Sequence, residues 1–350
     1  MSEQSERAAR RQAQRQATLE RNEAQARRQQ KSTVRRRSAL IAGISVLVVG
    51  VVVLVVFLVT RTSPPTKPSG PVLTKQTLAK VANASATAQG DGGAWVTDDD
   101  RDLLIRFDPS TQHTGPSVHL GGRPVDLLLS GTHLWVAEMV TNDVQEFDAA
   151  TLKLVRTVAV PSGPAGLAIL DGALWVASVD ANQVTSINLA NGLKGNVLPV
   201  PGGAVRIAAG FGSLWVTGTT NTLTPITPGD HGTGTVLPAV TVGQAPIGVT
   251  TGDGSVWVAN SAGGTVSRVN PKTRTVISTD HVGGNPLSLA VVGDTVYLAD
   301  GSGQSVRTIY PAPVSKKLDL GVTPRLLLPV DGGIWVASAN PGRVLEVKPG

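Results

Sequence analysis

The chain has 350 residues and no cysteine, so its composition excludes disulfide bonds, thiolate chemistry and cysteine-ligated zinc. Its net charge of +6 comes from one segment, because residues 1–37 carry eleven Lys/Arg against four Asp/Glu. The remaining residues, 38–350, are close to neutral. A nucleic-acid-binding domain would need positive charge on its folded surface, so no nucleic-acid partner is predicted.

An uncharged apolar run follows the basic segment. The 22 residues from Ala39 to Thr60 carry no charge, and as a helix they would extend about 33 Å, enough to cross a hydrocarbon core of about 30 Å. The run is longer than the apolar part of a signal peptide, and no Ala-x-Ala cleavage site follows it. The sequence therefore predicts an uncleaved transmembrane helix over residues 38–60.

The charges that flank this run predict its orientation. Four basic residues lie directly before it, namely Lys31, Arg35, Arg36 and Arg37. Only Arg61 and Lys67 follow it closely. The positive-inside rule then places residues 1–37 in the cytoplasm as a basic tail and everything after residue 60 on the extracytoplasmic side of the cell membrane. Residues 61–71, which contain four prolines, are expected to form a semi-rigid linker.

A Gly-x-x-Trp-Val phrase recurs through residues 72–350. Its aromatic positions are Trp95, Trp135, Trp175, Trp215, Trp257, Tyr297 and Trp335. They are spaced 40, 40, 40, 42, 40 and 38 residues apart, and every tryptophan of the chain falls in this register. Such self-similarity predicts a duplicated structural unit of about forty residues.

Each unit contains four short apolar stretches separated by turn residues. In the second unit these are residues 124–129, 133–137, 144–148 and 154–160. Four strands in about forty residues, repeated seven times, predict an all-β fold, a seven-bladed β-propeller over residues 72–350. We expect the repeated aromatic residue to fill the wedge between neighbouring blades as the structural core of the repeat; a ring of aromatic ligand cages is the competing interpretation.

The two ends of the repeat region predict how the ring closes. The chain ends just after residues 343–348, a third strand, so the last blade lacks its fourth. Residues 72–80 supply one, because Thr77-Leu-Ala-Lys aligns with Thr157-Val-Ala-Val in the second unit. We therefore expect the N-terminal strand of the repeat region to complete the last blade and remove two exposed sheet edges.

Three phrases of the repeat carry a family resemblance. They are Gly-Ser-Val-Trp-Val-Ala-Asn at 254–260, Thr-Val-Ser-Arg-Val-Asn-Pro-Lys-Thr at 265–273, and Val-Gly-Gly-Asn-Pro-Leu-Ser-Leu-Ala at 282–290. With them the chain resembles bacterial YVTN/NHL-type propellers, including the YncE-like and virginiamycin B lyase-like groups. The resemblance implies the propeller fold, while these families contain binding, sensing and catalytic members.

The lyase resemblance also implies a site. That enzyme uses His and Glu at blade positions around a magnesium ion, and its second strands tend to end in an aromatic-Thr-Glu phrase. In this chain the matching position is Glu only at Glu138; the other blades carry Asp98, Ser178, Gly218, Asn260, Asp300 and Ser338. The departure argues against lyase activity.

Other patterns give no catalytic or metal site. The five histidines are His113, His119, His133, His231 and His281, and none lies at a metal-ligand spacing from another. The acidic run at residues 98–102 lacks the Asp-x-Asp-x-Asp-Gly pattern of a calcium loop, so we expect a solvated turn there. No catalytic residue, metal or cofactor is therefore predicted.

The first strands of a propeller line its axis, and the loops between successive blades open onto one face. At that end the sequence places Arg123, Asp126, Arg206, Gln244, Asn285, Ser288 and Arg325. Three arginines against one aspartate favour an anionic ligand, because guanidinium binds carboxylate or phosphate in a bidentate manner. The alternative is that these charges pair with one another between blades.

Taken together, the sequence predicts a membrane-anchored extracytoplasmic propeller that acts as a non-enzymatic binding, scaffold or sensor module. A cell-envelope protein, a polymer or another anionic ligand is its expected partner. The alternative function is a metal-dependent lyase or hydrolase that uses the same funnel. Residues 219–233, with a two-residue insertion, are either a binding loop or a degenerate repeat.

Overall fold

The computed structural model describes residues 70–90 and 92–350, which lie within one compact unit, Pro68–Gly350. The predicted basic tail, the predicted transmembrane helix and all but the end of the predicted linker lie outside these residues. Among the residues described, no helix has the length and apolar character needed to cross a bilayer.

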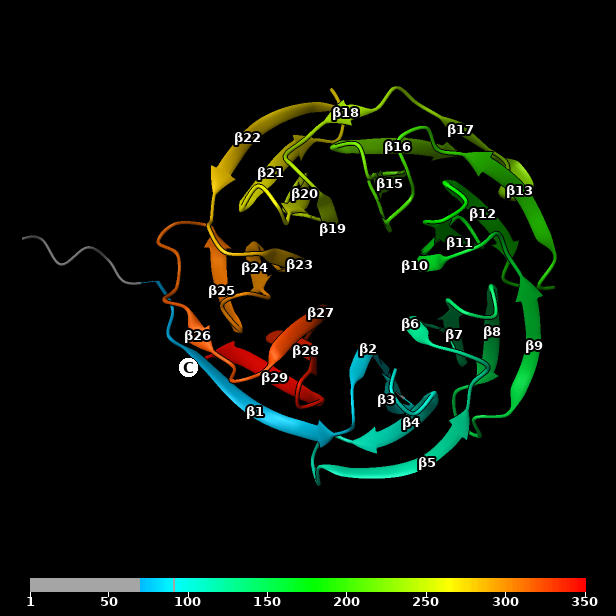
Figure 1. Ribbon diagram of the computed structural model, residues 1–350, viewed down its shortest axis with the longest axis horizontal. Helices are drawn as coiled ribbons and strands as arrows, with labels where there is room; N and C mark the ends of the chain where they lie inside the picture. The colour runs from blue at the N-terminus through cyan, green and yellow to red at the C-terminus, as the bar shows by residue number, and fades with distance from the viewer. Residues whose placement is uncertain (1–69, 91) are drawn as a thin grey trace, which may run out of the picture. The chain divides into compact units, whose positions relative to one another are not determined.

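Seven antiparallel sheets surround a central axis, and in six of them the chain runs from the axis outward through the whole blade (Figure 1). Short strands rich in Val, Leu, Ile and Thr form these sheets. Branched side chains favour the extended backbone, and successive side chains of a strand point to opposite faces of the sheet. The predicted all-β, seven-bladed propeller is confirmed.

The blades are numbered here in chain order. Blade 1 contains β2 (Ala84–Gly90), β3 (Gly93–Asp98), β4 (Leu103–Asp108) and β5 (His113–His119). Blade 2 contains β6 (Pro124–Ser130), β7 (His133–Glu138), β8 (Asp143–Asp148) and β9 (Leu154–Ala159). Blade 3 contains β10 (Pro164–Leu170), β11 (Ala173–Ser178), β12 (Gln183–Asn188) and β13 (Lys194–Pro199). Blade 4 contains β14 (Arg206–Gly210), β15 (Ser213–Thr217), β16 (Thr222–Pro228), β17 (Gly234–Val236) and β18 (Val240–Thr241).

The remaining three blades follow the same order. Blade 5 contains β19 (Pro246–Gly252), β20 (Ser255–Asn260), β21 (Thr265–Asn270) and β22 (Thr275–His281). Blade 6 contains β23 (Pro286–Val292), β24 (Thr295–Asp300), β25 (Ser305–Tyr310) and β26 (Leu318–Asp319). Blade 7 contains β27 (Thr323–Val330), β28 (Gly333–Ala339), β29 (Arg343–Pro349) and β1 (Leu73–Lys80).

The ring is closed by β1, which lies beside β29 as the outer strand of blade 7 (Figure 1). The two strands pair antiparallel from Leu73↔Pro349 to Lys80↔Arg343, with a bulge between Thr77 and Ala79. The expected closing strand is therefore present, and it joins the two ends of the repeat region through main-chain hydrogen bonds.

The aromatic residue of each second strand is buried between two blades. All seven are at most 3% exposed, and each belongs to an apolar cluster that includes the core of the next blade. Trp95 of blade 1 packs with Leu134 and Val136 of blade 2, while Trp335 of blade 7 contacts Phe107 of blade 1 with ring centroids 5.6 Å apart. The aromatic residues thus fill the wedges between the blades, as expected for the structural core of the repeat.

The irregular segment at residues 219–233 lies on the outside of blade 4. Two short strands share its outer edge, with β17 and β18 pairing with opposite ends of β16. The single-turn helix η1 (Asp230–Gly232) connects β16 to β17, and Ser186 of blade 3 donates a hydrogen bond to the Gly232 carbonyl. The insertion therefore divides an outer strand and contributes nothing to the wall of the axial cavity described below.

Candidate functional site

A cavity of about 530 Å³ lies at the axis of the propeller, within the volume of 300–1,000 Å³ typical of small-molecule sites. Every blade contributes to it through the residue ten positions before its repeated aromatic residue. These seven residues, called here the rim ring, are Ser85, Val125, Ala165, Val205, Ile247, Leu287 and Arg325.

Backbone irregularity turns the rim ring toward the axis. In six blades the pairing of the first and second strands shifts beside the rim residue, so that this residue is left out of the ladder. Val125, for example, lies between the pairs Pro124↔Glu138 and Asp126↔Ala137. A bulge of this kind re-aims a side chain. In five of the six blades the preceding residue is a proline, which cannot donate to the ladder; in blade 1 it is Ala84.

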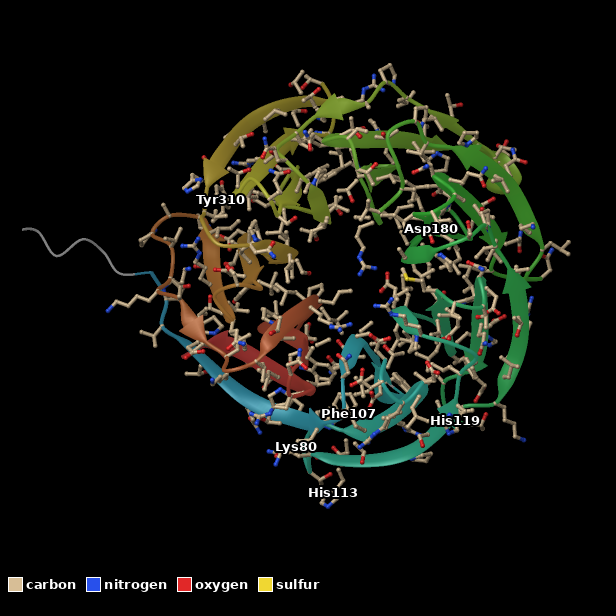
Figure 2. The ribbon with its side chains drawn as sticks, in the orientation of Figure 1. Lys80, Phe107, His113, His119, Asp180 and Tyr310 are labelled. Carbon is tan, nitrogen blue, oxygen red and sulfur yellow. The ribbon has the colours of Figure 1, made fainter. Side chains whose placement is uncertain are left out.

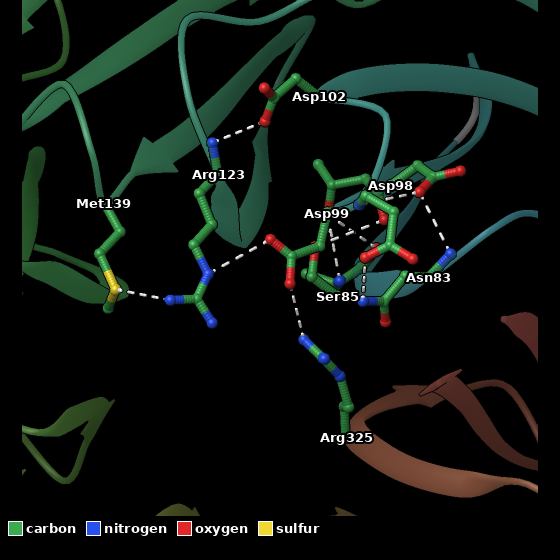
Figure 3. Close-up of polar contacts among 11 residues, drawn as sticks. Asn83, Ser85, Asp98, Asp99, Asp102, Arg123, Met139 and Arg325 are labelled. Carbon is green, nitrogen blue, oxygen red and sulfur yellow. Dashed lines mark hydrogen bonds and ion pairs between the residues drawn. The ribbon is translucent and has the colours of Figure 1, made fainter. Parts of the chain in front are cut away.

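Two arginines at the cavity share one carboxylate (Figure 3). Arg123 Nε lies 3.4 Å from Asp99 Oδ1, and Arg325 Nη1 lies 3.1 Å from Asp99 Oδ2. The Asp99 side chain is only 9% exposed, whereas those of Arg123 and Arg325 are 54% and 36% exposed. These contacts join blades 2 and 7 to blade 1, and one carboxylate leaves the pair of arginines with a surplus positive charge.

Arg206 differs from the other two arginines. Its Nη1 is buried without a hydrogen-bond partner. Its electrostatic counterpart is Asp126, whose oxygens already accept the main-chain N–H groups of Leu127 and Leu167, each at 2.9 Å. Burial raises the pKa of the Asp126 carboxyl, and the charge of Arg206 opposes that shift. Arg206 is therefore a cation with an unused donor in the wall of the cavity.

The remaining predicted ligand residues divide into two kinds. Ser288 lines the cavity, but its Oγ accepts the N–H of Leu327 at 3.1 Å, so it links blade 6 to blade 7 much as Asp126 links blade 2 to blade 3. Gln244 and Asn285 are not among the residues that line the cavity. Of the seven predicted residues, the structure thus brings five together, with arginine donors facing the space.

The residues that end the second strands hold backbone loops. Glu138 is fully buried and accepts the N–H of Gly122 through Oε2 at 2.8 Å, while Oε1 has no partner. Burial raises its pKa to about 7, with Asp143 and other carboxylates contributing to the shift. Glu138 therefore fixes the loop that carries Arg123.

Asp98 and Asp300 occupy the same position in their blades. Asp98 accepts the N–H groups of Ala82 and Asn83 at 2.8 and 3.1 Å. Asp300 accepts those of Asn285 and Gly303 and pairs with Lys317; although burial alone would raise the pKa of Asp300, these contacts lower it to about 2. Most of these oxygens bind main-chain N–H groups or Lys317, and no group of three or more His, Asp or Glu residues among those described could hold a metal ion. The residues present therefore do not fit the magnesium site that the lyase resemblance implies.

The acidic run at residues 98–102 differs from the surface turn that the sequence predicts. The expectation of a solvated turn is wrong for Asp98, which is fully buried, and for Asp99, which holds two arginines. Asp102 accepts the N–H of Arg123 at 2.7 Å (Figure 3). The run therefore organises the cavity mouth.

The histidines whose side chains the structure describes lie away from the cavity wall. His113 and His119 lie on the outer strand β5, at the outer edge of the propeller and far from its axis (Figure 2). His133 Nδ1 contacts Glu146, which also pairs with Arg156 on the neighbouring strand. His281 is exposed at the end of β22.

Sequence reasoning missed Asp99, Met139 and Val179. Met139 and Val179 line the cavity, and each of the three directly follows the second strand of its blade. The signal was available, because these loops open onto the same face as the loops between blades. It was overlooked because the acidic run was interpreted as a surface turn.

The fold is similar to that of solved propellers with differing roles. A catalytically inactive variant of virginiamycin B lyase from Staphylococcus aureus, solved with quinupristin, matches with a TM-score of 0.69 and 15% identity, covering 79% of this chain and 99% of that one. U3-55K matches with a TM-score of 0.66 and 11% identity, covering 79% and 99%. BamB from Moraxella catarrhalis matches with a TM-score of 0.57 and 16% identity, covering 76% and 83%.

These similarities assign the chain to the β-propeller class. At such identities they carry the fold alone, because one fold supports many activities. No known family model matches the sequence, and no curated protein matches it either.

Proposed function

We propose that the chain is a membrane-anchored extracytoplasmic binding module whose axial cavity captures an anionic group of a cell-envelope ligand. One observation carries the proposal: Arg206 lines the cavity with a buried Nη1 that has no hydrogen-bond partner. A buried, unpaired guanidinium donor is costly. A carboxylate or phosphate that enters the cavity would satisfy that donor.

The charges around the cavity support this polarity. Three arginines, Arg123, Arg206 and Arg325, line it, and two carboxylates, those of Asp99 and Asp126, are their partners. Among these residues three positive charges exceed two negative ones, so the lining of the cavity favours an anion, and low-dielectric walls strengthen the attraction.

The anchoring part of the proposal rests on the sequence. The apolar run at residues 38–60 is long enough to cross a bilayer, and the basic residues before it favour a cytoplasmic N-terminus. A binding module held at the outer surface of the membrane would meet anionic polymers, metabolites and proteins of the cell envelope.

The test measures stabilisation of the full-length protein by inorganic phosphate. The protein is held in nanodiscs of zwitterionic lipid, and its melting temperature is followed by tryptophan fluorescence while chloride is replaced by phosphate at constant ionic strength. A ligand that binds only the folded state raises the melting temperature in a saturable manner. We expect this rise in the native protein and its loss in the Arg206→Gln/Arg325→Gln variant.

The matched control is Arg274→Gln, which removes a cation from an exposed turn of blade 5. It should keep the response to phosphate. Equal stabilisation of the native protein and the double variant would show that phosphate binds elsewhere and would refute the proposal.

A further inference from the structure

We infer that the ligand of the axial cavity is an amphipathic anion, in which one carboxylate or phosphate is attached to a compact apolar body. The inference rests on the proposed anion site at Arg206 and names the chemical class that the rest of the cavity selects.

The rim ring is divided into two sectors. Blades 2 to 6 contribute five apolar residues in succession, namely Val125, Ala165, Val205, Ile247 and Leu287. Blades 7 and 1 contribute Arg325 and Ser85. Within the rim ring, polar side chains therefore come from two of the seven blades, whereas a site for a fully hydrated anion or a sugar would need polar groups all around it. The other polar residues of the wall are Arg123, Asp126, Arg206, Thr250 and Ser288, which lie outside the rim ring.

The next layer of the wall continues the apolar surface. It is formed in blades 3 to 7 by the residue two positions after the rim-ring residue. All five members are apolar: Leu167, Ile207, Val249, Leu289 and Leu327. Met139 and Val179 add apolar surface near the mouth. The apolar wall is therefore two residues deep on one side of the axis.

Packing within the protein buries most of the second layer, namely Leu167, Ile207, Leu289 and Leu327, but it leaves most of the apolar rim ring in contact with solvent. Val125, Val205, Ile247 and Leu287 each remain partly exposed, although they lie at the centre of the fold. Contiguous apolar surface that stays in contact with solvent marks a binding region, and a ligand that covers it gains free energy from each buried methylene.

Arg206 lies inside the apolar sector. Val205 precedes it, and its neighbours around the rim ring are Ala165 of blade 3 and Ile247 of blade 5. An anion bound to Arg206 would therefore have Asp126 nearby and these apolar side chains around it, so that the groups attached to the anion enter the apolar sector.

The experiment compares acetate, butanoate and hexanoate with hexan-1-ol, using the full-length protein in zwitterionic nanodiscs and apparent dissociation constants from melting temperatures. Each methylene buried in the cavity should tighten binding about fourfold. Hexanoate should also bind more tightly than hexan-1-ol. The Arg206→Gln variant should lose the preference for carboxylate over alcohol. Any shift in melting temperature that comes from partition of the probes into lipid should remain in this variant.

Two substitutions isolate the apolar wall. The Val205→Thr/Ile247→Thr variant places two hydroxyl groups in the apolar sector and removes one carbon atom at position 247. Val276→Thr makes the Val-to-Thr change on the exposed outer strand β22. The first should flatten the dependence on chain length while acetate binding persists, and the second should leave it unchanged.

The outcomes separate the two proposals. If no carboxylate stabilises the protein, the anion site itself is wrong. If acetate and hexanoate stabilise it equally, or if the chain-length dependence survives in Val205→Thr/Ile247→Thr, the anion site stands and the amphipathic ligand is overturned.

Discussion

At the scale of single residues, the residue that ends the second strand has different contacts in different blades. Asp98, Glu138 and Asp300 use it to bind the main chain of the loop that enters the same blade. Of these, Glu138 combines full burial, one unpartnered oxygen and a pKa of about 7. Its protonation is therefore coupled to folding in the neutral pH range.

This coupling predicts a pH-dependent stability. The folded state keeps the proton of Glu138 up to a pKa of about 7, whereas the ordinary value is 4.5. Because the folded state binds more protons between these values, its free energy of unfolding should fall as the pH rises from about 4.5 to 7 and then level off. Glu138→Gln, which is always neutral, should remove that fall, which is about 3 kcal/mol.

Urea unfolding followed by tryptophan fluorescence at pH 5 and pH 8 measures the effect. Asp294→Asn, a substitution on an exposed turn, serves as the control and should retain the native pH dependence. The burial argument would be wrong if Glu138→Gln lost stability across this interval as steeply as the native protein does.

At the scale of elements, closure of the ring depends on β1. Leu78 of this strand is 3% exposed and packs with Ala94 and Val96 of blade 1 and with Val344 of β29. The strand therefore holds blade 7 and also covers the interface with blade 1. Among the residues described there is no disulfide, so the pairing of β1 with β29 and the apolar contacts of Leu78 are the main interactions that hold the ring closed.

The closing strand can be tested by a matched pair of substitutions. Leu78→Asp places an unpaired charge in an apolar interface and should lower stability by several kcal/mol, whereas Gln76→Asp adds the same charge at an exposed position of the same strand and should change it by less than about 0.5 kcal/mol. Melting temperatures of the full-length variants decide the matter. Similar values for the two would show that β1 does not hold the ring.

The sequence predicted elements better than it predicted contacts. The spacing of the aromatic residues was enough for the seven blades, and the alignment of Thr77 with Thr157 was enough for β1. The split outer edge of blade 4 was left undecided because short strands such as β17 and β18 carry little periodicity. Asp126 and Ser288 were proposed as ligand residues, yet both accept N–H groups of the next blade. Such a contact depends on how neighbouring first strands are placed, which local sequence does not reveal.

At the scale of the whole molecule, the absence of cysteine makes the predicted topology directly testable. Single cysteines are introduced by Ser5→Cys in the basic tail and by Lys272→Cys in an exposed turn of blade 5. In intact cells a membrane-impermeant maleimide should label the Lys272→Cys protein and spare the Ser5→Cys protein until the membrane is permeabilised. The reverse pattern would invert the topology, and labelling of neither in intact cells would place the propeller inside.

The central claim is that the axial cavity binds an amphipathic anion, and the most direct measurement locates a bound probe. A hexanoate that carries a diazirine is photolysed with the full-length protein in nanodiscs, and the modified residues are identified by mass spectrometry. The account predicts modification of the axial first strands β6, β10, β14, β19 and β23, together with its loss in Arg206→Gln. Modification confined to the outer strands, or unchanged in Arg206→Gln, would contradict it.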